Sequence, residues 1–236
     1  MVKKIVGTGV LLVLALALQA GVKMYTLKSP DGKVKLEVTA GQGIAYSLFY
    51  DGRLLLKPSR IALHTDLPEA DHWENIRITG TKQRHVSETV QAPFYRVKEF
   101  GIDCNELELR LNNGFSLLMR AYNDGMAYRF VAGRKGEMTV VEERAEFNFA
   151  DDFEAYIPYS TNPKDPWNMA FQNFYTKAPL TQYNTELPAF LPLTVDAGAV
   201  KLTLLESDLE AYPGMFVCGD GKTPALKGVF AASGNV

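Results

Sequence analysis

The sequence predicts an all-β protein, folded as a large antiparallel β-sandwich. Apolar and charged residues alternate with a period of two in several segments, as in strands with one buried and one solvated face. Pairs of Asp or Asn with Gly separate these segments, and no helical periodicity longer than two turns appears after residue 20. Many short strands without helices must cover one another's apolar faces, which two packed sheets or a barrel can do. Of these two architectures we expect the sandwich.

The strands can be placed in chain order by this alternation. It is clearest at 33–38 and 106–111, where every second residue is Val or Leu. An Asx-Gly pair supplies the positive φ of a tight turn, which predicts the hairpins 43–50/53–57 and 105–111/115–121. The four pairs are Asp31-Gly32, Asp51-Gly52, Asn113-Gly114 and Asp124-Gly125. Further strands are expected at 73–79, 83–90, 126–131, 138–149, 154–159, 189–195 and 200–205.

A proline-rich and aromatic segment, 159–188, interrupts the strands. A loop of this length is usually functional or part of an interface. Flat aromatic rings can cover the apolar face of a sugar while amides bind its hydroxyl groups, and Trp167, Asn168 and Gln172 would suit this role. Alternatively, the aromatic side chains pack against another domain or close a sandwich edge, since interfaces are enriched in Trp, Tyr and Phe.

The first twenty residues have the pattern of a secretion signal. Lys3 and Lys4 precede an apolar run, and small residues follow it at positions that a signal peptidase accepts. We therefore expect a signal peptide at 1–20, a mature domain at 21–236, and a secreted, periplasmic location without a membrane anchor. Lys and Arg number 25 against 27 Asp and Glu, a formal net charge of -2 that does not favour nucleic acid as a partner.

The sequence contains two cysteines and three histidines, and neither set forms a metal-binding spacing. An oxidising compartment would permit a bridge between Cys104 and Cys218, and two separately buried thiols are the alternative. His64 with Glu206 would resemble the acid and base of a sugar mutarotase, but no spacing supports the pair. Zinc and redox chemistry are not indicated.

The acidic residues offer no evident catalytic pair. Glu142, Glu143 and Glu146 lie close together on an expected strand and should alternate between solvent and a neighbouring strand. We favour a solvated face for them, because charged side chains normally lie there. A second cluster lies in LTLLESDLEAYPGM, residues 202–215. Here Ser207 and Glu210 have the spacing of a helix capping box, which leaves Glu206 without a local explanation.

Five blocks of the sequence, taken together and in order, resemble the N-terminal domain of glycoside hydrolase family 97. This family comprises periplasmic α-glucosidases and α-galactosidases. The resemblance covers about 200 residues. The blocks are Leu27 to Gly32, Leu56 to Arg60, Arg120 to Arg129, Glu146 to Phe149, and Leu205 to Leu209 with Tyr212 to Met215.

The resemblance implies a galactose-mutarotase-like β-supersandwich, followed in the family by a catalytic (β/α)8 barrel and a small β domain. The catalytic residues of the family belong to the barrel, and this chain ends at Val236. We therefore expect no catalytic residue here and no activity of the chain alone. The expected partners are the barrel of the full-length enzyme and an α-linked oligosaccharide.

The resemblance also implies a role for Glu206, because family members use a glutamate of this stretch as a ligand of an active-site calcium. Calcium takes about 6–8 oxygen ligands, so the others would come from the barrel. The Glu206 rim and segment 159–188 would then present apolar surface without that barrel. A carbohydrate-binding module and a mutarotase-like epimerase are the alternatives. Glucoside or galactoside specificity, stereochemistry and oligomeric state stay open.

Overall fold

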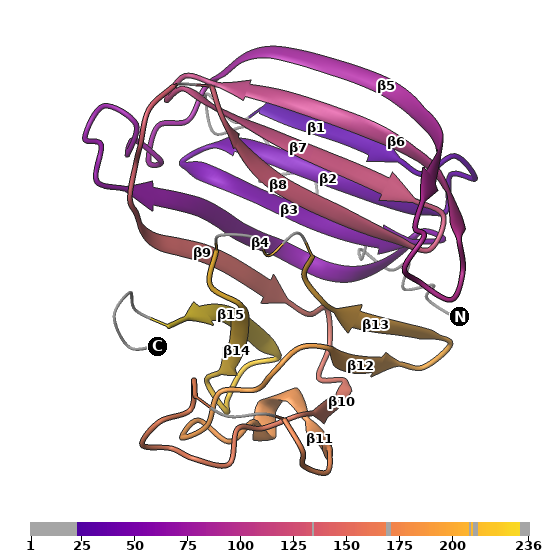
Figure 1. Ribbon diagram of the computed structural model, residues 1–236, viewed down its shortest axis with the longest axis vertical. Coiled ribbons are helices and arrows are strands. Elements are labelled where there is room, and N and C mark those ends of the chain that lie inside the picture. Colours follow the sequence, from indigo (N-terminus) through magenta and orange to yellow (C-terminus); the bar gives the residue numbers. More distant parts are fainter. Residues whose placement is uncertain (1–22, 134, 169–170, 208, 210–211, 232–236) are drawn as a thin grey trace, which may run out of the picture.

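The computed structural model in Figure 1 describes residues 23–133, 135–168, 171–207, 209 and 212–231. All pairs of neighbouring strands are antiparallel. Within the described residues, the one helical element is a single 3-10 turn, Leu180–Gln182. No described helix has the length and apolar character needed to cross a membrane. The expected all-β, antiparallel fold is confirmed.

The strands form three sheets. The first sheet contains, in spatial order, β1 (Lys23–Lys28), β2 (Val34–Gly41), β3 (Gly43–Tyr50), β4 (Arg53–Thr65), β9 (Val140–Asn148), β15 (Ala225–Phe230) and β14 (Met215–Gly219). The second contains β5 (Ile78–Gln91), β6 (Glu99–Leu111), β7 (Phe115–Tyr122) and β8 (Gly125–Ala132). The third contains β11 (Thr176–Pro179), β10 (Glu154–Ile157), β12 (Leu193–Ala197) and β13 (Val200–Leu204).

The core lies where the second sheet covers β1 to β4 of the first (Figure 1). Alternate residues of both sheets point into this layer, which is why the period of two was visible in the sequence. Leu36, Leu109 and Leu117 have no exposed surface. Burying each such side chain contributes about 2 kcal/mol. The other elements extend from this sandwich (Figure 1).

The two hairpins predicted from Asx-Gly pairs are present. Asp51 and Gly52 join β3 to β4 with φ values of 48° and 78°, as a two-residue turn requires. The turn between β6 and β7 uses Gly114, at φ 86°. The Asx-Gly pairs therefore predicted these two connections correctly.

Three parts of the strand assignment differ from the expectation. Residues 73–77 are not a strand. Trp73 is instead buried in the core, and its indole nitrogen donates to the carbonyl of Leu63 at 2.9 Å. β1 and β11 were not predicted, and neither were β14 and β15. Their connection contains Asp220-Gly221, with Gly221 at φ 65°, so an Asx-Gly signal was available in the sequence.

β14 also holds the segment 159–188 in place. The Tyr183 hydroxyl donates to the carbonyl of Val217 at 2.7 Å. Gly219 lies so close to the Tyr183 ring that a Cβ there would come within 2.7 Å of it. Cys104 and Cys218 are both free thiols, the first buried and the second half-buried.

Candidate functional site

Glu206 lies in the connection from β13 to β14, and its carboxylate is held by the backbone. The amide of Met215 donates to both carboxylate oxygens, at 2.9 Å and 2.8 Å. Gly214 comes close to the same group, since a Cβ there would lie 3.4 Å from Oε1. The Tyr-Pro-Gly-Met sequence therefore folds back on Glu206 and fixes its orientation. Burial raises the pKa of Glu206, and the Met215 amide opposes this rise.

Glu143, on β9, is the second acid of this site. The Tyr212 hydroxyl donates to its Oε2 at 2.7 Å. Burial raises the pKa of Glu143, the Tyr212 hydrogen bond lowers it, and the negative charge of Glu206 raises it further. Among the described residues, no lysine or arginine lowers the pKa of Glu143 or of Glu206. Glu143 and Glu206 therefore repel each other, and their negative charges are only partly balanced by the hydrogen bonds that they accept.

Aromatic side chains lie on the side of Glu143 and Glu206 that faces the protein interior. Tyr212 packs edge-on against Phe230, with ring centroids 5.9 Å apart. Tyr128, on β8, lies 5.9 Å from the Tyr46 ring. Burial raises the pKa of Tyr128 well above its ordinary value, and the charge of Glu143 adds to the rise. The carboxyl groups therefore border the apolar sandwich on one side and solvent on the other.

The acids of β9 do not share one environment, so the expectation of a solvated face is wrong for Glu143. Glu142 is exposed, whereas Glu143 is half-buried. Glu146 is also half-buried, and it binds Arg144 at 2.5 Å and the Arg60 amide at 3.1 Å. The alternating direction of strand residues separates Glu142 from Glu143, but only the fold places Tyr212 and Glu206 beside the latter.

His64 lies in a different setting from the one imagined for a mutarotase. Its Nδ1 is 2.7 Å from the Asp71 carboxylate, and its ring lies edge-on to Trp73 at 6.5 Å. Both His64 and Asp71 are partly exposed at the end of β4. In the part of the chain that the structure describes, no three His, Cys, Asp or Glu side chains gather as a metal site would require.

The aromatic residues of segment 159–188 divide into two groups. Trp167 packs edge-on against Phe216 at 4.9 Å, and Phe171 packs on Phe190 at 5.4 Å. These rings close the edge of the sandwich, as the second sequence interpretation proposed. Phe174 is 92% exposed and Tyr175 45% exposed, so part of the segment faces solvent.

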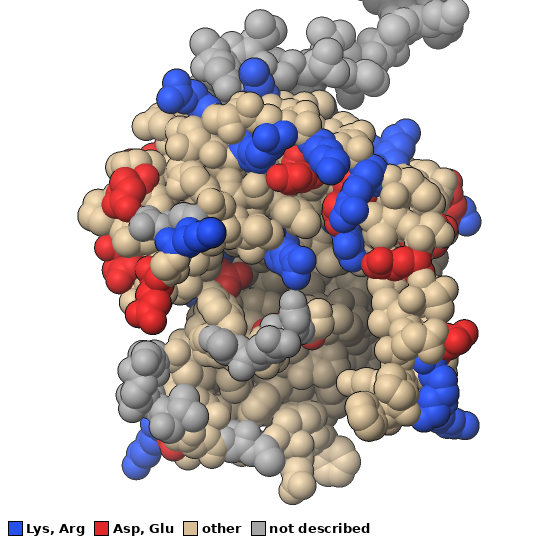
Figure 2. Space-filling view, turned by 45° about the horizontal axis from the view of Figure 1, so that its top comes forward, with Lys and Arg blue, Asp and Glu red and all other residues tan. Residues whose placement is uncertain are grey.

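Charge is unevenly distributed over one face of the protein. Figure 2 shows a face that is hollowed in its middle, with charged side chains gathered above the hollow and mostly uncharged surface below it. Leu205 and Leu209, which flank Glu206, are 66% and 49% exposed. Two exposed apolar side chains therefore lie near Glu206 in the sequence.

Some sequence expectations fall on residues that the structure does not describe. They are the signal peptide at 1–20 and the capping box, of which Asp208 and Glu210 lie outside the described residues. Sequence analysis missed Glu143 and Tyr212 as parts of the site. The sequence signal closest to them was the Tyr-Pro-Gly-Met block, which contains Tyr212 and lies next to Glu206.

Comparisons with known proteins agree with this architecture. The chain is 41% identical over 209 residues to a retaining α-galactosidase of Bacteroides thetaiotaomicron, covering 86% of this chain and 31% of that protein. It is 26% identical over 158 residues to a probable retaining α-galactosidase of Streptomyces bingchenggensis, covering 65% of this chain and 24% of that protein. The chain therefore spans less than a third of the length of these relatives.

Solved structures share the fold at lower identity. A glycoside hydrolase family 97 enzyme from Pseudoalteromonas sp. strain K8, in complex with panose, superposes with a TM-score of 0.72 at 18% identity, over 87% of this chain and 32% of that chain. A β-arabinopyranosidase superposes with a TM-score of 0.75 at 20% identity, over 89% of this chain and 36% of that chain. Residues 27–233 match the family described as glycosyl-hydrolase 97 N-terminal. The chain belongs to this family.

Proposed function

We propose that this chain is the N-terminal accessory domain of an α-glycoside hydrolase, and that it supplies Glu206 as one ligand of a calcium ion and forms part of the active-site wall. The observation that carries this proposal is the fixed and only half-buried carboxylate of Glu206. Each of its oxygens accepts one hydrogen bond from the Met215 amide and keeps a lone pair for another partner.

The donor set suits a hard cation. Carboxylate oxygens are the ligands that calcium prefers, and a cation would relieve the repulsion between Glu206 and Glu143. Glu206 offers at most two oxygens, so the remaining ligands belong to the catalytic barrel or to water. Calcium bound there would supply concentrated positive charge beside the glycan. The exposed Leu205 and Leu209 support a covering domain at this rim.

An α-galactoside is the substrate that we propose, because the relative at 41% identity is a retaining α-galactosidase. The neighbour bound to panose is only 18% identical, so it supports the fold rather than α-glucosidase activity. We also propose that residues 1–20 direct secretion to the periplasm, on the order of charged, apolar and small residues in that stretch.

The test uses two proteins and two substrates. One protein is the chain alone, and the other is a chimera in which it replaces the matching 209 residues of the Bacteroides relative. Hydrolysis of aryl α-galactoside and aryl α-glucoside is measured with calcium and with chelator. We expect no turnover by the chain alone, and turnover by the chimera that requires calcium.

Glu206→Gln in the chimera should abolish the calcium dependence together with most of the activity, since an amide is a weaker calcium ligand than a carboxylate. Glu142→Gln, at an exposed glutamate of β9, is the matched control and should leave turnover unchanged. Turnover by the chain alone would contradict the accessory role. Calcium-dependent turnover that survives Glu206→Gln would contradict the ligand assignment.

A further inference from the structure

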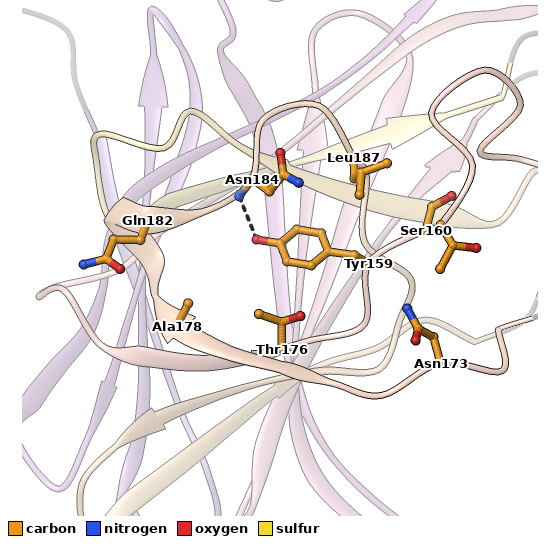
Figure 3. A pocket seen from close by; sticks show the side chains of 9 residues that line it. Tyr159, Ser160, Asn173, Thr176, Ala178, Gln182, Asn184 and Leu187 are labelled. Carbon is orange, nitrogen blue, oxygen red and sulfur yellow. Dashed lines mark hydrogen bonds between the residues drawn. The ribbon is translucent and has the colours of Figure 1, made fainter.

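Segment 159–187 borders an open hollow of about 460 Å³ that shares no residue with the Glu206 site. Figure 3 shows Tyr159 in the middle of the lining residues, with Asn184 beside its hydroxyl group. The volume lies in the range of small-molecule sites, about 300–1,000 Å³. The hollow is lined by Tyr159, Ser160, Thr161, Asn173, Thr176, Ala178, Gln182, Asn184 and Leu187.

The chemistry of the lining favours a neutral, hydroxyl-rich ligand. Seven of the nine lining side chains carry a hydroxyl or amide group, the exceptions being Ala178 and Leu187, and none carries a charge. Tyr159 and Ser160 are buried, and the Ser160 hydroxyl donates to the Pro166 carbonyl. The polar side chains open to a ligand are therefore those of Thr161, Asn173, Thr176, Gln182 and Asn184. Hydroxyl and amide groups both donate and accept hydrogen bonds, as sugar hydroxyl groups do. A phosphate or carboxylate ligand would lack a cationic partner among these residues.

The lining is held in place by its own hydrogen bonds. The Tyr159 hydroxyl accepts a hydrogen bond from the backbone N–H of Asn184 at 2.7 Å. The Tyr159 ring packs edge-on against Tyr183, with ring centroids 5.0 Å apart. Thr176 and Ala178 lie on β11, which pairs with β10 in regular register. A preformed wall lowers the ordering cost of binding, so modest contacts can give measurable affinity.

An exposed aromatic ring lies next to the hollow. A second depression, of about 310 Å³, is lined by Phe171, Gln172, Asn173 and Phe174, and Asn173 lines both. The Phe174 ring is 92% exposed. The apolar face of a hexose packs on such a ring, while the adjacent amides bind the hydroxyl groups. Trp167, the ring favoured by the sequence, is instead packed against Phe216.

We propose that the hollow, together with Phe174, binds one or two hexose units of a neutral α-linked oligosaccharide as a second glycan site outside the Glu206 rim. The choice of an α-linked glycan rests on the proposed function, whereas the hollow and its chemistry do not. Such a site would hold a long substrate near the enzyme without taking part in bond cleavage.

The experiment is titration of the full chain with melibiose and with maltotriose, followed by saturation-transfer NMR and calorimetry. We expect saturable binding of at least one of them in the millimolar range. Phe174→Ala should weaken it by about fivefold, the worth of one aromatic contact. Gln182→Ala, at an exposed lining residue, should weaken it as well.

Phe94→Ala is the matched control, because Phe94 is 96% exposed and lies in the connection from β5 to β6. The Phe94→Ala variant should bind the oligosaccharide with the same affinity as the unaltered chain. Absence of saturable binding, or equal weakening by Phe94→Ala and Phe174→Ala, would overturn the proposal. The titration is repeated on the Bacteroides chimera, where binding should persist; its loss there would overturn the proposal, because the hollow would then be covered by another domain.

This experiment is independent of the calcium test. If glycan binding is absent while Glu206→Gln still abolishes calcium-dependent turnover, the second site alone is refuted. If glycan binding is present but turnover ignores calcium, the Glu206 assignment alone is refuted.

Discussion

Glu106 on β6 is buried and Glu143 on β9 is half-buried, and the surroundings of the two carboxylates are opposite. Glu106 accepts from Arg84 Nε at 2.6 Å and from Arg120 Nε at 2.8 Å, and these bonds lower its pKa. Burial raises the pKa of Glu143, which has one hydrogen bond from Tyr212 and the negative field of Glu206 nearby.

The difference shows how a structural carboxylate can be told from an available one. Arg84 and Arg120 are the direct cross-strand partners of Glu106 in the two neighbouring ladders, so the second sheet compensates the charge of Glu106 internally. The cross-strand partner of Glu143 on β4 is Leu63. Places where a protein leaves a local rule unsatisfied are often functional, and the Glu143 and Glu206 pair is such a place.

The largest effect is expected for Glu106→Gln. This change removes the charge that holds two arginines, and one of them, Arg120, has only 27% of its side chain exposed. We expect a loss of about 2 kcal/mol in the free energy of unfolding, measured by urea denaturation, because charge-assisted hydrogen bonds are replaced by weaker ones. A loss below about 0.5 kcal/mol would mean that water replaces the carboxylate fully, and the comparison would fail.

The same substitution predicts a pH dependence. The folded pKa of Glu106 lies below its ordinary value of 4.5, so the charge contributes stability above that pH. The contribution is lost as the pH falls through the lowered folded pKa. The difference in stability between the unaltered chain and Glu106→Gln should therefore be constant near neutral pH and shrink as the pH falls below 4.5. A difference that grows on acidification would have the wrong sign and would contradict the ion-pair account.

The sequence predicted the sandwich well, because its signals are local. Alternation and Asx-Gly turns act over a few residues, and they located the β3–β4 and β6–β7 hairpins. The capping-box spacing of Ser207 and Glu210 left Glu206 unexplained, and its calcium role came from a family resemblance. The setting of Glu143 could not be predicted, since it depends on pairing between β9 and β15 and on Tyr212, 69 residues away.

The smallest effect is expected for Glu143→Gln, measured in chelator so that bound metal does not contribute. The amide removes a partly buried charge and its repulsion with Glu206, while its carbonyl still accepts the Tyr212 hydrogen bond. We expect the free energy of unfolding to rise by up to about 1 kcal/mol. Glu142→Gln, on the exposed face of the same strand, should change it by less than about 0.5 kcal/mol. Destabilisation by more than about 1 kcal/mol would show that the Glu143 carboxylate is already compensated in the folded chain. The Glu→Gln substitution should therefore lower the free energy of unfolding at position 106 and raise it at position 143. Such opposite effects would show that the Glu106 charge stabilises the fold, whereas the Glu143 charge is available to bind a partner.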